Sequence, residues 1–285
     1  MVIKACAPPG PEYLNAMHTS MTHFAYAMIG ITVLITLFYW LAAHGTKQSR
    51  HPWSRKRLIA FIIGSVLLLF AFSPPLLEWA HHDVRGHMVQ HLLLGMFAPV
   101  AWVIAAPMTL FLRTAPLGVS RGCSRLLRSN FFHILAHPAS AIMLNIGGMY
   151  LLYLTPLYLN SVNNLWWHVW MHLHFILAGY LYCWSIAGRD ASPFRSSFKL
   201  RLFTLLLGLA AHSYLAKLMY INLWPAVPFN TADEIRTAAK IMYYGGDLAE
   251  ALLAAALFYG WLEDRKKAGQ SRRISILFPA KKHLT

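Results

Sequence analysis

Two pairs of histidines carry the clearest chemical pattern in this sequence of 285 residues. His87 and His91 are four residues apart, and so are His168 and His172. This spacing places two side chains on one face of a helix, about one turn apart, so each pair can clamp a metal ion or face one pocket. Because neutral imidazole is the commonest metal-ligating side chain, the pairs predict a metal or cofactor site. The alternative is that they cap helices at a membrane interface, beside the neighbouring tryptophans.

Methionines beside the histidines indicate which metal such a site would hold. Met88 follows His87 in the first pair. A compact run near the N-terminus holds two residues of each type, Met17, His18, Met21 and His23. Thioether sulfur combined with imidazole suits Cu(I), so we expect copper at the site. The alternative is that the methionines fill gaps between apolar side chains.

Four further polar residues fall inside apolar stretches, namely His212, Lys217, Asp247 and Glu250. A charged side chain at membrane depth costs at least about 2.5 kcal/mol, so such groups usually face the bundle interior and pair. One interpretation is a structural ion pair between Asp247 and Lys217. The other is that Asp247 or Glu250 orients a metal-ligating imidazole.

The composition limits the kind of fold that positions these residues. Hydrophobic residues make up 57% of the chain and charged residues 12%, and the mean hydropathy is +0.45. A soluble domain carries about 25% charged residues. The composition therefore excludes an ordinary soluble enzyme, a disordered chain and a collagen-like chain. It predicts an all-α, polytopic bundle of membrane-spanning helices.

Seven apolar runs have the length of a membrane span, which is about 20 residues. They cover Thr22–Ala43, Leu58–Leu77, His87–Leu112, Ile134–Tyr158, Leu165–Ala187, Leu200–Asn222 and Lys240–Leu262. All must be helical, because lipid offers a backbone amide no other partner. The pair Pro74–Pro75 and Pro156 predict helix ends, whereas Pro99 and Pro107 predict a kink inside the third run.

Basic residues alternate between the loops and predict the orientation of the helices. Lysine and arginine concentrate in the first, third and fifth loops and in the C-terminal tail, and the net charge of the chain is +15. Positive loops favour the cytoplasm, so we expect the N-terminus outside, the C-terminus inside and both histidine pairs near the outer surface. The basic side then faces anionic membrane lipid, and no nucleic acid is required.

This topology predicts three parts in the plasma (inner) membrane of a bacterium. They are an extracytoplasmic tail over residues 1–21, a seven-helix multi-pass domain over 22–262 and a basic cytoplasmic tail over 263–285. The three cysteines, Cys6, Cys123 and Cys183, fall at different depths, so no disulfide framework is expected. Cys6 is either an outer thiol ligand or an incidental residue of the tail. No nucleotide-binding or nucleophile motif occurs in the sequence, so no enzymatic reaction is predicted.

The stretches that carry the histidines resemble one family of membrane proteins. His87–Leu94 reads HMVQHLLL and leads to two Ala-Pro pairs, whereas His168–Phe175 reads HVWMHLHF and precedes Gly188-Arg189-Asp190. With His212 and Asp247, these blocks are similar to the CtaG-type family of cytochrome c oxidase assembly proteins. The family often has Asp-Gln-Gln where this chain reads Asp247-Leu248-Ala249, so the seventh span departs from the pattern.

The resemblance implies a polytopic membrane assembly factor for a haem-copper oxidase, with copper delivery to an oxidase subunit as the usual proposal. It implies functional roles for six residues, His87, His91, His168, His172, His212 and Asp247. Two alternatives stay open. One is a b-type membrane cytochrome that binds haem through one histidine of each pair and transfers electrons. The other is a cofactor-free scaffold that grips an oxidase subunit.

Overall fold

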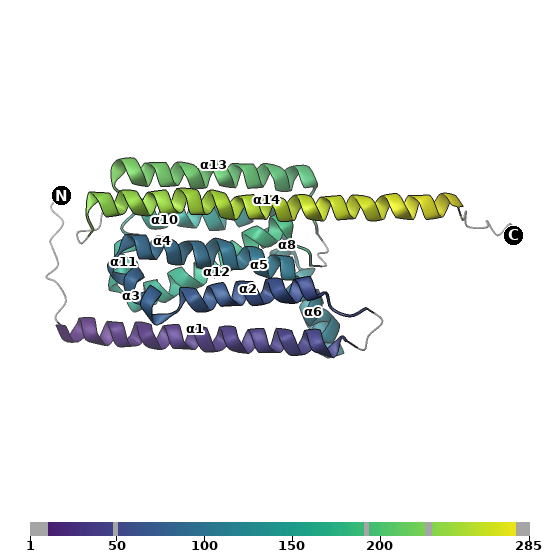
Figure 1. Cartoon of the computed structure of the whole chain (residues 1–285), viewed down its shortest axis with the longest axis horizontal. Helices are drawn as coiled ribbons and strands as arrows, with labels where there is room; N and C mark the ends of the chain where they lie inside the picture. Colours follow the sequence, from purple (N-terminus) through teal and green to yellow (C-terminus); the bar gives the residue numbers. More distant parts are fainter. Residues whose placement is uncertain (1–10, 48–50, 191–193, 226–229, 278–285) are drawn as a thin grey trace.

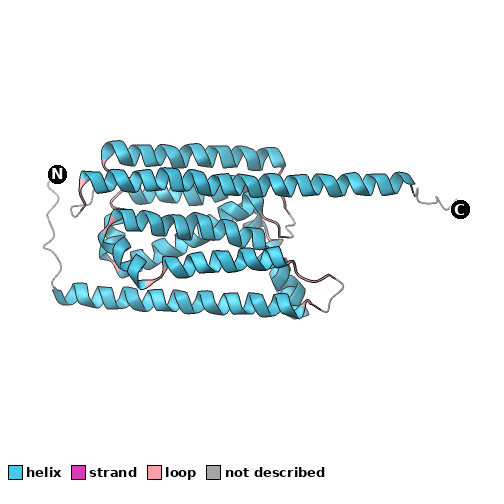
Figure 2. Ribbon diagram, viewed as in Figure 1, coloured by secondary structure: helices cyan, strands magenta, loops and turns pink. Residues whose placement is uncertain are grey.

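The computed structural model describes residues 11–47, 51–190, 194–225 and 230–277, with side chains from residue 19 to residue 270 within those ranges. The elements described there are helices joined by turns and short loops, without a strand (Figure 2). The long helices run side by side in one bundle, and α14 projects beyond one end of it (Figure 1). This architecture confirms the predicted all-α class.

Within the described residues, five helical segments are long and apolar enough to cross a membrane. They are α1 (Pro11–Gly45, with the apolar part from Thr19), Val84–Ala105, α12 (Leu165–Ala187), α13 (Phe198–Asn222) and α14 (Ala232–Leu277). Two bent pairs raise the number to seven if each is one span. Large apolar side chains point outward along these helices, for example Phe38, 68% exposed, and Ile221, 73% exposed. Such a surface fits a lipid environment rather than water.

The first bent pair joins α2 (Arg55–Ala71) to α3 (Pro74–His82) at an angle of 54°. The predicted helix boundary at Pro74 is confirmed, because α3 begins on that residue. Proline has no backbone N–H and its φ is preset for a first helical position, so it starts a helix more readily than it continues one.

The third predicted span is too long at its C-terminal end. It comprises α4 (Val84–Leu92), a π-helical turn η1 (Leu93–Phe97) and α5 (Ala98–Ala105), and it stops before Leu112. Ala106 takes a left-handed conformation, with φ of 52°, and α6 (Pro107–Thr114) then starts as a separate helix. Proline disfavours the helical conformation in the residue that precedes it, which explains why the helix ends before Ala106. The π turn ends at Phe97, two residues before Pro99, where a kink was predicted, and α5 continues from Ala98 to Ala105.

The fourth predicted span, Ile134–Tyr158, is divided into short elements. They are α8 (Asn130–Leu135), α9 (Pro138–Ile142), the π turn η2 (Met143–Gly147), α10 (Gly148–Leu154) and α11 (Leu157–Asn163). The bend between α10 and α11 is 80° and lies at Pro156, so the predicted helix end there is confirmed. Before this region, α7 (Leu117–Leu127) connects α6 to α8.

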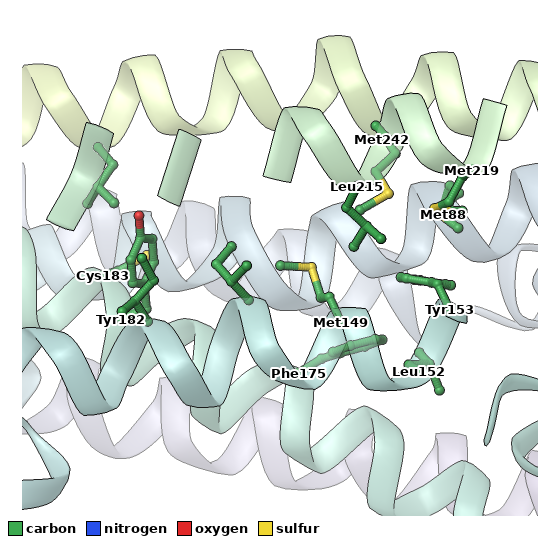
Figure 3. Packing of buried hydrophobic residues seen from close by; sticks show 14 of the residues in the cluster. Met88, Met149, Leu152, Tyr153, Phe175, Tyr182, Cys183, Leu215, Met219 and Met242 are labelled. Carbon is green, nitrogen blue, oxygen red and sulfur yellow. The ribbon is translucent and has the colours of Figure 1, made fainter. Parts of the chain in front are cut away.

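Close backbone contact brings the helices of the two histidine pairs together. A Cβ atom on Gly179 of α12 would lie 2.1 Å from the carbonyl oxygen of Gly95 in η1, so the two backbones touch there. Small residues allow such an approach between membrane helices. Phe175 of α12, whose Cβ lies near Gly95, and Tyr153 of α10 belong to the buried apolar core (Figure 3).

Ion pairs tie both ends of the bundle. At the end that carries α3 and α11, called here the histidine end, Arg85 contacts Asp83 at 2.5 Å and Glu234 at 3.2 Å. At the opposite end, called the basic end, Arg189 pairs with Glu263. There Asp190 accepts hydrogen bonds from the backbone N–H of Thr109 at 2.6 Å and from its hydroxyl at 2.7 Å. Burial raises the pKa of Asp190, and the Thr109 hydrogen bonds oppose that rise.

Candidate metal site

The two predicted histidine pairs face the interior of the bundle. His87 and His91 lie on α4, and His168 and His172 lie on α12. Their exposed fractions are 5%, 2%, 6% and 1%, respectively. Rings that cap helices at a membrane surface would be partly exposed, so this burial disfavours the interfacial interpretation. The spacing of four residues therefore presents each pair inward, as expected.

His172 is held by a chain of hydrogen bonds that crosses three elements. Its Nε2 lies 3.0 Å from Gln90 Oε1, and its Nδ1 lies 2.9 Å from the carbonyl oxygen of His168. Gln90 in turn donates from Nε2 to the carbonyl oxygen of Ala71 at 2.8 Å. Both ring nitrogens of His172 thus lie beside protein oxygens, and the single N–H of a neutral ring donates to one of the two. The rings of Phe24 and Phe72, with centroids 6.1 and 5.9 Å away, cover its other side.

The α4 pair differs in how its nitrogens are used. His87 Nε2 lies 3.1 Å from the hydroxyl oxygen of Tyr153. His91 packs against Phe175, with ring centroids 4.5 Å apart, and neither of its ring nitrogens has a hydrogen-bond partner among the described residues. A buried polar group without a partner costs roughly 1–3 kcal/mol on mutational scales, so the open nitrogens of His91 are unfavourable in the described part of the chain.

His168 connects the pair on α12 to a histidine that sequence reasoning did not single out. Its ring lies 4.3 Å from that of His172 and 6.3 Å from that of His81 at the end of α3. The Nε2 of His168 has no hydrogen-bond partner within the described part of the chain. The signal that could have pointed to His81 is its place in a His-His dipeptide just before the first histidine pair.

The four imidazoles of the two pairs do not converge on one point in the described part of the chain. Among the described residues, no three histidine, cysteine, aspartate or glutamate side chains converge in a way that could hold a metal ion. Tyr153 and Gln90 engage His87 and His172, which leaves His91 and His168 with open nitrogens on different helices.

His212 on α13 is fully buried, and both of its ring nitrogens lack a partner among the residues described. Its ring packs on Gly246 of α14, where a Cβ atom would lie 2.1 Å from Cε1. Asp247 Oδ1 accepts a hydrogen bond from the Ser213 hydroxyl at 2.9 Å, and no hydrogen bond joins Asp247 to His212 among the described residues. The predicted orientation of an imidazole by Asp247 therefore does not occur through a hydrogen bond.

The predicted ion pair between Asp247 and Lys217 is wrong. Lys217 is exposed, and its ammonium group lies 5.5 Å from the ring centroid of Tyr243. The lysine side chain extends to the bundle surface and lies over the Tyr243 ring. An exposed cation in contact with an aromatic ring does not require a buried carboxylate as a partner. Glu250 is 3% exposed, and neither of its carboxyl oxygens has a partner in the described part of the protein.

The predicted sulfur ligands are scattered. Met88 is fully buried in the apolar core beside Met219 and Met242 (Figure 3). Met21 is 3% exposed on α1, whereas His23 is exposed. Three predicted residues, Met17, His18 and Cys6, lie outside the described side chains. The compact run near the N-terminus therefore does not gather Met21 and His23 into one cluster.

The site as a whole is a line of buried imidazoles rather than one closed cage. Neutral imidazole nitrogens in a low-dielectric interior suit a soft, singly charged ion that needs few ligands better than a hard divalent ion. The buried imidazole nitrogens without a hydrogen-bond partner among the described residues include those of His91, His168 and His212.

Comparison with known proteins places the chain among membrane assembly factors. A family model described as cytochrome c oxidase caa3 assembly factor (Caa3_CtaG) matches residues 36–264. An uncharacterized protein of Mycobacterium bovis and one of Mycobacterium tuberculosis are each 28% identical over 260 residues, which is 85% of this chain and 39% of the relative. An uncharacterized protein of Mycobacterium leprae is 30% identical over 196 residues, covering 66% of this chain and 30% of that protein. The chain thus spans well under half the length of these relatives. No solved structure matches the chain.

Proposed function

Because the chain belongs to the cytochrome c oxidase caa3 assembly factor family, we propose that it holds Cu(I) at its histidine end and delivers it to a subunit of a haem-copper oxidase. Copper is cargo in this proposal, and no bond-breaking reaction by the protein is needed. We further propose that the histidine end faces the outside of a bacterial plasma membrane, since the basic end carries the arginine-rich loops that favour the cytoplasm.

The observation that carries the proposal is the set of buried imidazoles whose nitrogens have no protein partner. His91, His168 and His212 each leave at least one such nitrogen open, on three different helices. An unpartnered buried polar group is destabilising, so its presence supports a role in binding. His87 and His172 are held by Tyr153 and Gln90 and serve to fix the rings around the open ones.

An anaerobic Cu(I) titration of the purified chain, with a chromophoric chelator as competitor, tests the binding step. We expect the triple variant His91→Gln/His168→Gln/His212→Gln to lose tight binding. The matched control is His23→Gln/His82→Gln, because both of those rings are exposed on elements of the same end. Circular dichroism shows whether each variant keeps its helices. Equal Cu(I) affinity in the triple variant and the wild type would refute the assignment of the site.

Gene deletion tests the delivery step and separates it from a purely structural role. We expect loss of the oxidase activity that depends on this protein, and we expect added copper to restore part of that activity. A cofactor-free scaffold would produce a defect that copper does not relieve. The optical spectrum of the purified protein addresses the haem alternative, because a bound b-type haem would give a strong Soret band.

A further inference from the structure

A crevice opens at the histidine end between α1 and α3. It has a volume of about 110 Å³, and α1 contributes Met21 to its lining while α3 contributes Glu78 and His81. The crevice exists because the chain bends by 54° between α2 and α3, whereas α1 continues as one helix alongside them. Thioether, carboxylate and imidazole groups therefore share one small opening at this end of the bundle.

We propose that this crevice is the loading site at which Cu(I) first binds before it reaches the buried imidazoles. The inference rests on the proposed function, and it adds a site and a route that the two histidine pairs do not contain. Met21 and His81 supply the soft and borderline donors that suit Cu(I), and Glu78 supplies the negative charge that attracts a cation. Glu78 is exposed, so an ion at the crevice keeps contact with water while it exchanges ligands.

The geometry behind the crevice leads inward through His168. The ring centroid of His81 lies 6.3 Å from that of His168, which lies 4.3 Å from that of His172. His168 is 6% exposed, and its Nε2 is free of any partner among the described residues. Phe24 and Phe72 cover His172, so His168 is the first buried imidazole that an ion leaving His81 meets.

Transfer along this route is a series of ligand exchanges. Copper stays in the Cu(I) state throughout, each bond to sulfur, oxygen or nitrogen is replaced by a bond to the next donor, and no covalent bond of the protein breaks. The crevice offers one thioether, one carboxylate and one imidazole at its mouth. An ion held there can exchange these ligands for the imidazole of His168, which lies behind His81.

The test is the rate at which the full chain takes Cu(I) from a chromophoric chelator under anaerobic conditions, measured by stopped flow. We expect Met21→Leu/Glu78→Gln/His81→Gln to load about tenfold more slowly, as a barrier raised by roughly 1.4 kcal/mol would give, and to reach the same final stoichiometry. The matched control is Met28→Leu/His82→Gln, which changes one methionine on α1 and one histidine on α3 outside the crevice lining. The control is expected to load at the wild-type rate.

A second variant keeps the test valid if the triple variant misfolds. Ala25 also lines the crevice and is 2% exposed, so Ala25→Leu narrows the opening without removing a donor. It is expected to slow loading as well. If both variants load at the wild-type rate, the inference is wrong and the buried site fills by another route. If the wild type itself binds no Cu(I), the proposed function is wrong, and the inference about the loading site is wrong as a consequence.

Discussion

Replacing Gly179 with alanine is the most informative single change for testing how the site is built. The new Cβ would lie 2.1 Å from the carbonyl oxygen of Gly95 and 2.8 Å from its carbonyl carbon. Both atoms belong to the backbone of η1, so no side chain can rotate away and the two helices must separate. Over-packing of this kind typically costs about 1–3 kcal/mol. The helix shift would also move His172 away from Gln90.

The assay combines thermal unfolding of the detergent-purified chain with the Cu(I) titration. We expect Gly179→Ala to lower the unfolding midpoint and to weaken Cu(I) binding together, because one displacement causes both effects. The control is Gly30→Ala on α1, where nothing lies within 4 Å of the added Cβ. Alanine there should be neutral or stabilising by about 0.5–1 kcal/mol, since glycine is unfavourable inside a helix. Equal stability of Gly179→Ala and Gly30→Ala would refute the claim that α12 and η1 touch through their backbones.

Two further changes probe the contacts around the histidine end. Gln90→Leu removes the hydrogen bonds that connect Ala71 to His172, and it leaves a buried carbonyl oxygen and a ring nitrogen without partners. We expect the free energy of unfolding, measured with a chemical denaturant, to fall by roughly 1–3 kcal/mol. An unchanged unfolding midpoint would contradict this. Burial raises the pKa of Asp83, but hydrogen bonds from Arg85 and Trp79 outweigh it and hold that pKa below its usual 3.8. The contribution of Asp83 to stability is therefore complete above pH 3.8 and declines as the pH falls through the lowered pKa, and acid unfolding of Asp83→Asn should lack this decline.

Composition and proline positions were enough to predict the class of fold. Because lipid offers no hydrogen-bond partner to the backbone, apolar runs of span length are expected to form helices. The predicted boundaries at Pro74 and Pro156 are confirmed for the same kind of local reason, since proline cannot continue a helix hydrogen-bond pattern. The extent of the third span was predicted wrongly because hydropathy does not register the left-handed turn at Ala106.

The histidine pairs were predictable as pairs, but their individual roles were not. A spacing of four residues determines that His87 shares a face with His91, and it says nothing about what that face meets. The π turns and the burial of Glu250 lay beyond sequence reasoning as well, because both depend on how neighbouring helices pack. The error on Lys217 arose because a side chain of that length can reach the bundle surface instead of a buried partner.

The sequence by itself determined a helical membrane bundle in which two helix faces each present two imidazoles, because helix geometry and the absence of water in lipid act locally on every segment. Only the tertiary structure decided which ring nitrogens are open. Tyr153, 66 residues from His87, and Gln90, 82 residues from His172, engage two of the rings, whereas nothing in the described part of the chain engages the nitrogens of His91. The close approach of Gly95 to Gly179 is likewise a contact between distant segments that no local pattern specifies.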